Sequence, residues 1–180
     1  RRMNDHVRHP DQKGYVWEWV ATRPSFCSNL NDRPYMTPTV KKEIHVWRRN
    51  IDAVVTDHAP HEWEEKDQEF NLAPSGFVGL ETSVGAMLTY MYHTGNIDLM
   101  TLVNAMSTAQ AKILVLDAGV IAPGKDADLT VLDLDKEWTV DASKFYSKGK
   151  ASPFDEMIFK GKAAATIVNG KIVMKNGEVL

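Results

Sequence analysis

Cysteine is almost absent from this sequence of 180 residues, in which Cys27 is the only one. A single cysteine cannot form an internal disulfide, nor can it form a zinc site built from several thiolates. The start of the sequence also lacks a secretory signal pattern. Both observations favour a reducing compartment, and we expect the protein to work in the cytoplasm.

Long apolar runs and an excess of positive charge are missing as well. No stretch approaches the roughly 18 apolar residues of a membrane-spanning helix, so we expect no membrane span. The formal net charge is −3 with both signs interspersed, which argues against a nucleic-acid partner. An apolar fraction of 43% and a charged fraction of 25% are typical of a soluble globular protein.

The stretch with the clearest chemistry is Asp57-His58-Ala59-Pro60-His61, which directly follows the apolar run 51–56. A β-branched run that ends in a carboxylate and two imidazoles predicts a buried strand leading into a loop. In parallel α/β folds such loops usually carry the chemistry. Pro60 excludes a regular helix across the loop. A second interpretation is that Asp57 caps a turn and the histidines are merely hydrogen-bonded loop residues.

A carboxylate at the end of a buried strand can bind a divalent metal, accept a proton, or do both in one cycle. Zinc takes oxygen and imidazole nitrogen ligands and lowers the pKa of a bound water to about 7. A neighbouring aspartate can then take the proton from that water as it attacks a carbonyl. One aspartate alone is too few ligands for a metal site.

Helical periodicity follows this loop. The apolar positions that share one predicted helical face are Leu80, Val84, Met87, Leu88 and Met91. Gly95 is expected to end that helix, and Asp98 to cap a second one that runs through Met106. A third helix is expected from about Thr108, stopping near Gly119.

Four polar or mixed segments carry weaker signals. The alternation over 15–20 fits a strand or a short helix equally well, and 42–50 fits a helical turn. The charged run 62–67 is interpreted as a solvated helical turn. His6 and His9 have the spacing of a metal pair, but with no third ligand at a matching offset we interpret them as part of a solvated basic segment.

Near residue 120 the apolar period changes from that of a helix to that of a strand. Residues 127–133 alternate in the manner of a strand, and 166–173 predict a hairpin whose turn is Asn-Gly. Asn176-Gly177 predicts a further tight turn. We therefore divide the chain into residues 1–119, with helices on a parallel strand, and residues 120–180, with a small antiparallel sheet.

These motifs together resemble the dihydroorotases of the amidohydrolase superfamily. The matching segments are 56–61, Glu64-Glu65-Lys66, Ala73-Pro74 with Gly76, Gly79 and Glu81-Thr82, and then 123–129, 147–154 and 166–171. The resemblance extends over residues 51–180 with little change of spacing. Its D-H-A-P-H and Ser-Lys-Gly-Lys elements are those of the longer, bacterial-type class.

The resemblance implies an α/β fold, with 1–119 as the C-terminal part of a (β/α)8 barrel and 120–180 as strands of a small β-sandwich domain. It implies reversible, zinc-dependent hydrolysis of the cyclic amide of dihydroorotate to carbamoyl aspartate, in pyrimidine synthesis. One or two zinc ions would lie at the catalytic face. The substrate would be a small molecule.

The resemblance also implies roles for individual residues. Asp57, at the end of the last barrel strand, would be both a zinc ligand and the general acid/base. His61 would bind the substrate carboxylate, and Ser75 and Gly76 would present backbone N–H groups to the same ligand. His58 would be structural or would support the ligands.

Two departures from the family pattern stand out. The family's H-x-H pair of zinc ligands is missing, because no two of the six histidines are separated by one residue. The family's bridging lysine and two later histidine ligands are not located either. Where the family has M-N-P-P-L-R, this chain has M-T-P-T-V-K, so that Thr37 replaces an asparagine. We therefore expect a partial chain, or one from which segments are missing.

Three hypotheses for function follow. The first is a zinc-dependent dihydroorotase, and the second is another cyclic amidohydrolase, of the dihydropyrimidinase or allantoinase type. The third is a non-catalytic dihydroorotase-like subunit that binds a partner such as aspartate transcarbamoylase. Self-association into a homo-oligomer is compatible with each of them.

Overall fold

The computed structural model describes residues 15–17, 51–69 and 72–180, and all structural statements concern these ranges. Its elements are β1 (Tyr15–Trp17), β2 (Ile51–Val54), α2 (Trp63–Lys66), α3 (Ser83–Met87), η2 (Leu88–Tyr92), α4 (Leu99–Val103), η3 (Asn104–Thr108), α5 (Ala109–Ile113), β3 (Leu129–Thr139), η4 (Ala142–Lys144), β4 (Ile158–Val168), β5 (Lys171–Lys175) and β6 (Glu178–Val179). The predictions made for His6, His9, Thr37 and 42–50 fall outside the described residues.

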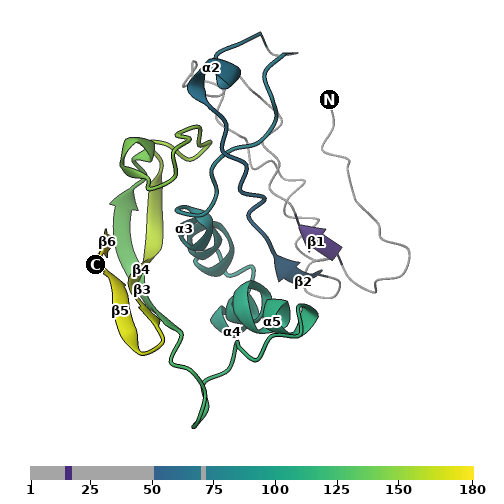
Figure 1. Cartoon of the computed structure of the whole chain (residues 1–180), viewed down its shortest axis with the longest axis vertical. Helices are drawn as coiled ribbons and strands as arrows, with labels where there is room; N and C mark the ends of the chain where they lie inside the picture. The colour runs from purple at the N-terminus through teal and green to yellow at the C-terminus, as the bar shows by residue number, and fades with distance from the viewer. Residues whose placement is uncertain (1–14, 18–50, 70–71) are drawn as a thin grey trace.

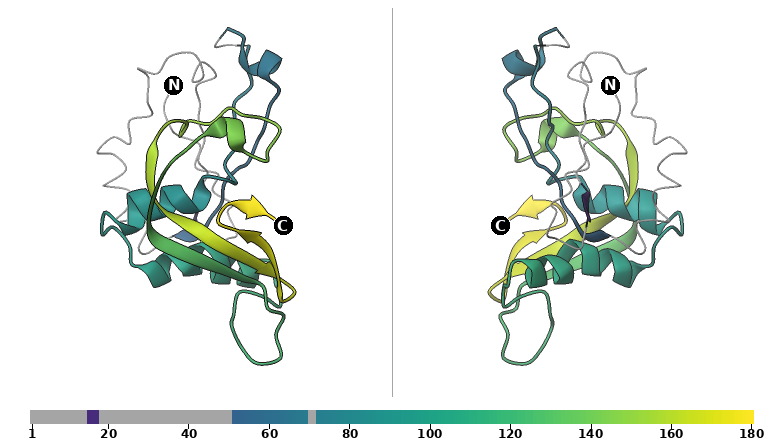
Figure 2. Two further views of the ribbon diagram at one scale, coloured as in Figure 1. Left: turned by 90° about the vertical axis from the view of Figure 1, so that its left-hand side faces the viewer. Right: turned by 90° about the vertical axis from the view of Figure 1, so that its right-hand side faces the viewer.

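The elements lie in successive layers. Figure 1 shows the antiparallel sheet of β3 to β6 on one side, the helices in the middle, and β1 with β2 on the other side. The side views in Figure 2 agree, because the helices run across one face of the sheet. The short helix α2 lies apart from these layers, at one end of the molecule.

Strand β2 is the buried strand predicted before the Asp57 loop. It pairs in parallel with β1, with Tyr15 opposite Ile51 and Trp17 opposite Val54. Val54 is only 6% exposed, as the apolar run requires. The strand stops two residues before the predicted end at 56, and the ambiguous segment 15–20 forms a strand over 15–17.

The helix after the loop is continuous from α3 into η2, over residues 83–92. Met87, Leu88 and Met91 are buried, as the helical face predicts. Leu80 was wrongly assigned to that face, since its side chain is 60% exposed. The reason is that the helix begins later: the N–H of Ser83 donates to the carbonyl of Gly79, and 80–82 form the preceding turn.

The second and third predicted helices are one helix, formed by α4, η3 and α5 over 99–113. Asp98 caps it as expected, because its carboxylate accepts a hydrogen bond from the N–H of Thr101 at 2.8 Å. The separation predicted near Thr108 was wrong, because no glycine or proline interrupts 99–113 and Thr108 has helical dihedral angles. None of the helices in the described ranges is long and apolar enough to cross a membrane.

The C-terminal region forms the antiparallel sheet that the sequence predicts. Its strand order is β3, β4, β5 and β6. Asn169 and Gly170 turn the chain with φ of +49° and +75°, and Asn176 and Gly177 do so with +53° and +92°. Positive φ at both central residues is the requirement of a tight hairpin turn, which Asn-Gly meets. The sheet is confirmed, whereas a second sheet facing it is not found among the described residues.

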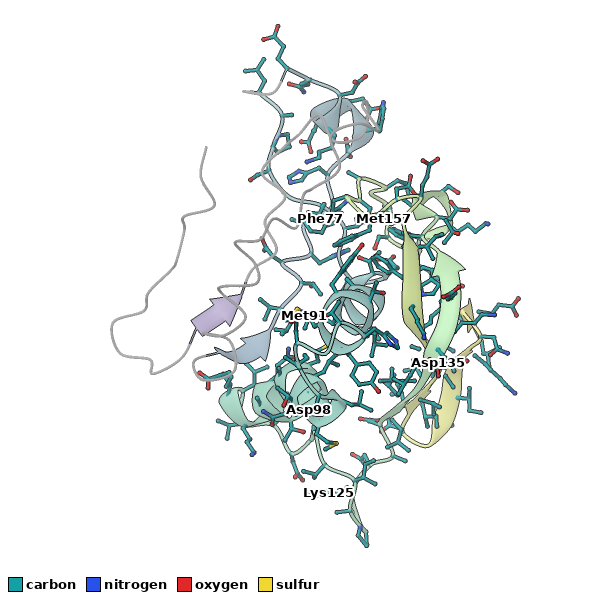
Figure 3. The ribbon with its side chains drawn as sticks, turned by 180° about the vertical axis from the view of Figure 1, so that it is seen from behind. Phe77, Met91, Asp98, Lys125, Asp135 and Met157 are labelled. Atoms are coloured by element: carbon teal, nitrogen blue, oxygen red, sulfur yellow. The ribbon has the colours of Figure 1, made fainter. Side chains whose placement is uncertain are left out.

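Two apolar clusters hold the layers together. One lies between β2 and the helices and contains Val54, Met87, Leu88, Met91, Ile97, Leu102 and Ala105. The other lies between the helix 83–92 and the sheet and contains Phe77, Val78, Ala86, Val140, Ala142, Phe145, Phe154 and Phe159. Figure 3 shows Phe77 beside Met157 at one end of the sheet, and Met91 in the centre of the molecule. The helix 83–92 therefore contributes to both clusters.

Glycines allow this helix to lie unusually close to the sheet. A Cβ atom at Gly85 would be 2.7 Å from Cδ2 of Phe159, and one at Gly161 would be 2.5 Å from Cδ1 of Leu88. Both distances are shorter than carbon atoms tolerate. The hydroxyl of Thr89 also accepts from the N–H of Lys160 at 2.9 Å, so a helix side chain bonds directly to the backbone of β4.

Replacing Gly161 by alanine tests this contact. We expect G161A to lower the free energy of unfolding by roughly 2–4 kcal/mol, because the new methyl group meets Leu88 and φ is +100°. The control is G124A, where φ is +80° but nothing lies within 4 Å of the new atom. It should cost roughly 1 kcal/mol. Equal losses in urea unfolding would show that backbone strain, and not the close contact, is responsible.

Candidate active site

Asp57 follows β2 and is presented to solvent. Its φ is +43°, in the left-handed region, which aspartate adopts more readily than most residues other than glycine. The side chain is exposed, and no described residue forms a hydrogen bond or ion pair with its carboxylate. The carboxylate is therefore available to a substrate, a water molecule or a metal ion.

A second segment, Pro74–Gly79, lies beside the Asp57 loop. His58 and Phe77 form an isolated parallel bridge, and the N–H of Ala59 donates to the carbonyl of Phe77 at 3.0 Å. The N–H of Gly79 donates to Nδ1 of His58 at 3.1 Å. Since Nδ1 is an acceptor here, the neutral ring carries its proton on Nε2. His58 thus helps to join the two segments.

His61 contacts an acceptor at each ring nitrogen. Its Nδ1 lies 3.2 Å from Oε2 of Glu65, and its Nε2 lies 3.0 Å from the carbonyl oxygen of Ser75. A neutral imidazole has one N–H and can satisfy only one of these acceptors, whereas the protonated ring satisfies both. The structure therefore brings together two predicted site residues, His61 and Ser75.

Lys66 binds the same segment from the other direction. Its ammonium donates to the carbonyl oxygens of Pro74 at 2.8 Å and Gly76 at 2.7 Å. The residue is only 6% exposed. The helical turn predicted in the charged run is confirmed as α2. The prediction that this turn is solvated was wrong at Lys66, because backbone carbonyls replace water around its ammonium.

Gly76 is packed too tightly for a side chain. Its φ is +112°, and a Cβ atom there would lie 2.7 Å from Cβ of Ala59 and 3.4 Å from Nε2 of His61. The backbone can therefore pass directly beside the Asp57 loop. Within the described ranges, the N–H groups of Ser75 and Gly76 donate no hydrogen bond. Both donors remain available to a ligand.

A third segment, 147–151, supports the other two. A Cβ atom at Gly149 would lie 2.9 Å from Cβ of Pro60, so glycine allows a close contact with the loop. The N–H of Val78 donates to the carbonyl of Ala151 at 3.0 Å. The N–H of Ser147 donates to Oε1 of Glu81 at 2.8 Å. The segment therefore connects the site to the antiparallel sheet.

Glu81 is the acidic group most affected by these contacts. Burial raises the pKa of its carboxyl, but hydrogen bonds from Ser147 outweigh this, so the pKa lies below its ordinary value. Its Oε2 is buried and has no hydrogen-bond partner in the described part of the chain. The carboxylate is thus held ionised beneath the loop.

Metal binding requires more ligands than this region supplies. Asp57 fits one position of a metal site, because it is exposed and unbonded at a strand end. However, the described residues contain no group of three His, Cys, Asp or Glu side chains that could hold an ion. The described residues therefore supply one ligand of a zinc site and do not complete it.

Sequence patterns did not indicate the roles of two residues. Lys66 belongs to a charged run, and such runs are usually solvated, so its burial gives no signal in composition or spacing. Glu81 belongs to the family-like motif but has no helical or strand position that predicts its bond to Ser147. The partners of Lys66 and Glu81 lie in other segments of the sequence and become neighbours only after folding.

Comparison with known proteins identifies the family of this chain. Residues 39–173 match the model of the amidohydrolase family. The chain belongs to the amidohydrolase family. Members of this family are generally metal-dependent enzymes, and the match implies a TIM-barrel-type fold.

Individual members give the degree of similarity. The chain is 52% identical to the dihydroorotase of Geobacter metallireducens over 69% of its own length and 29% of that protein. It is 46% identical to the dihydroorotase of Syntrophus aciditrophicus over 81% of its length and 36% of that protein. The L-hydantoinase (dihydropyrimidinase) from Arthrobacter aurescens has a TM-score of 0.73 and 38% identity, covering 78% of this chain and 32% of that one.

The chain of this amidohydrolase therefore spans only about a third of the length of the relatives that it matches. Their printed names describe the whole proteins. Activity, substrate and partners of this chain are accordingly treated as proposals.

The bond between Glu81 and Ser147 predicts a pH dependence of stability. Because the pKa of Glu81 is lowered by folding, its carboxylate stabilises the fold above its ordinary pKa of 4.5, and this is lost as the pH falls through the lower folded pKa. We expect E81Q to reduce the free energy of unfolding at neutral pH by roughly 1 kcal/mol or less, after solvent screening. Its loss of stability in acid should be shallower.

The matched control is E178Q, at an exposed position of β6. Urea unfolding at a series of pH values from neutral to below 4.5 gives the comparison. An acid dependence of E81Q identical to that of the unsubstituted protein would contradict the assignment.

Proposed function

We propose that the protein is a dihydroorotase, which reversibly hydrolyses the cyclic amide of dihydroorotate to carbamoyl aspartate in pyrimidine synthesis. The observation that carries the proposal is the 52% identity to a dihydroorotase across the region with the exposed Asp57 and the unbonded N–H groups of Ser75 and Gly76. A free carboxylate beside free N–H donors suits hydrolysis of a ring that itself bears a carboxylate.

Asp57 is the proposed general acid/base. Its carboxylate takes a proton from the water whose oxygen attacks the ring carbonyl carbon. When the C–N bond breaks, the same group returns the proton to the leaving nitrogen, and ring closure is the reverse. The exposed position of the carboxylate and its lack of a described partner support this role.

The substrate is proposed to bind to His61 and to the N–H groups of Ser75 and Gly76. The contact between Nε2 of His61 and the carbonyl of Ser75 holds these groups together. Nδ1 of His61 is engaged by Glu65, so a substrate carboxylate that uses this nitrogen has to displace the side chain of Glu65. In that case the substrate carboxylate would replace the carboxylate of Glu65 at Nδ1 of His61.

Zinc is the metal that we propose, with one or two ions and Asp57 as one ligand. Support comes from the metal dependence that is general in the family and from the oxygen ligand at the strand end. The remaining ligands would come from residues other than those described.

Several broader proposals rest on the same resemblance. Residues 1–119 would belong to the barrel, and 120–180 would contribute the sheet β3 to β6 to a small β-sandwich domain. The single cysteine supports a cytoplasmic location. Self-association and binding of aspartate transcarbamoylase stay predictions.

A second candidate is a hydantoinase or dihydropyrimidinase activity. The structural similarity to the Arthrobacter enzyme at 38% identity favours it, but the dihydroorotases match at higher identity. The two activities differ in whether the substrate ring carries a carboxylate, which the loop Ser75-Gly76 would recognise.

Substitution of Asp57 tests the proposed activity. We expect D57N to lower kcat for dihydroorotate hydrolysis by about 10²-fold to 10⁴-fold, because an amide neither accepts nor returns the proton. The control is D52N, an exposed aspartate of β2 outside the site, which should keep full activity. The measurement is the initial rate of the purified protein in both directions. Comparable rates for D57N and the unsubstituted protein would refute the role.

A further inference from the structure

We infer that Lys66 is a positioning residue for the proposed substrate-binding segment, fixing the directions of its backbone N–H groups. This inference rests on the proposed function for the identity of the ligand, and on geometry for the positioning itself. By our proposal, the ammonium does not touch the substrate. It acts through the peptide units between Pro74 and Phe77.

Lys66 is buried, and its ammonium therefore needs acceptors from the protein. A lysine that is 6% exposed has lost most of its water, and such a loss is costly unless the ammonium finds other acceptors. The carbonyl oxygens of Pro74 and Gly76, at 2.8 and 2.7 Å, supply them at short, charge-assisted distances. These bonds resist exchange with water because the site around the ammonium is nearly dry.

The geometry of the peptide units determines where the N–H groups of Ser75 and Gly76 point. In a planar trans peptide unit the N–H points opposite to the preceding carbonyl. When the carbonyl of Pro74 faces Lys66, the N–H of Ser75 faces away from it. The carbonyl of Ser75 faces His61, so the N–H of Gly76 faces away from that ring. Lys66 and His61 therefore set the directions of the two unbonded donors.

Lys66 directly follows Glu65 in the short helix α2. Glu65 bonds to His61, and Lys66 bonds to the Pro74–Gly76 backbone. A four-residue turn thus fixes both the imidazole and the backbone donors. Loss of the lysine should release the segment without removing any group that touches the substrate.

The test compares K66M with K171M, which removes an exposed lysine of β5. Methionine keeps the length of the side chain and loses the donors. Amide hydrogen exchange is followed at Ala59 and Gly79, whose N–H groups bond across the two segments, and at Val140, whose N–H bonds to Met157 in the sheet region. We expect faster exchange at Ala59 and Gly79 in K66M only, with Val140 unchanged.

Kinetics provide the second readout. We expect K66M to raise KM for dihydroorotate by about 10-fold to 100-fold, because a misplaced binding group weakens productive binding. The change in kcat should be smaller, and hydrolysis of dihydrouracil, the same ring without a carboxylate, should not change. K66R, which keeps the charge and the donors, should recover part of the lost affinity.

Each outcome is decisive. Unchanged exchange at Ala59 and Gly79 in folded K66M, or a fall in kcat at constant KM, overturns the inference. Faster exchange in K66M together with no dihydroorotase activity in the unsubstituted protein supports the positioning role and refutes the proposed function.

If K66M does not fold, the inference is tested on the unsubstituted protein by nuclear magnetic resonance. The Lys66 ammonium should then give a slowly exchanging ¹H–¹⁵N signal that is absent from K66R. Lack of such a signal overturns the inference.

Discussion

The close contact between the helix 83–92 and strand β4 determines where the site can form. It depends on the missing side chains of Gly85 and Gly161, which let Phe159 and Leu88 approach the opposite backbone. With the sheet held at this distance, the segment 147–151 beyond it reaches the Asp57 loop. A bulkier residue at either glycine would collide with Phe159 or Leu88, so that the helix or the strand would have to shift.

The site itself is held by polar contacts to the backbone, in addition to the apolar packing of Phe77 and Val78. Lys66, His61 and His58 each bind main-chain groups of Pro74–Gly79, and Glu81 binds the N–H of Ser147. Such bonds fix direction as well as distance, which apolar contacts do not. We propose that the loop presents backbone donors to a small ligand, which needs this directional control, and the short helix α2 contributes to it through Glu65 and Lys66.

The sequence predicted the parts of the fold that depend on neighbouring residues. The strand before Asp57, the cap at Asp98 and both Asn-Gly turns follow from local pattern and backbone preference, and all are present. The start of the helix after Leu80 and the continuity of 99–113 were predicted wrongly although both are local: the N–H of Ser83 bonds to Gly79, and no glycine or proline interrupts 99–113. The burial of Lys66 did not follow, because its bonds to Pro74 and Gly76 form only when the chain folds. The site residues came from the family resemblance, while their supporting contacts came only from the structure.

We propose that the two joined segments recognise a cyclic amide through its carboxylate. The most direct test is the ratio of kcat/KM for dihydroorotate to that for dihydrouracil, measured on the same preparation of the purified protein. The account predicts a preference for dihydroorotate of at least about 10²-fold, because the donors of Ser75 and Gly76 are left unpaired by a ring without a carboxylate. Equal or faster hydrolysis of dihydrouracil would contradict it and would favour the hydantoinase-type activity.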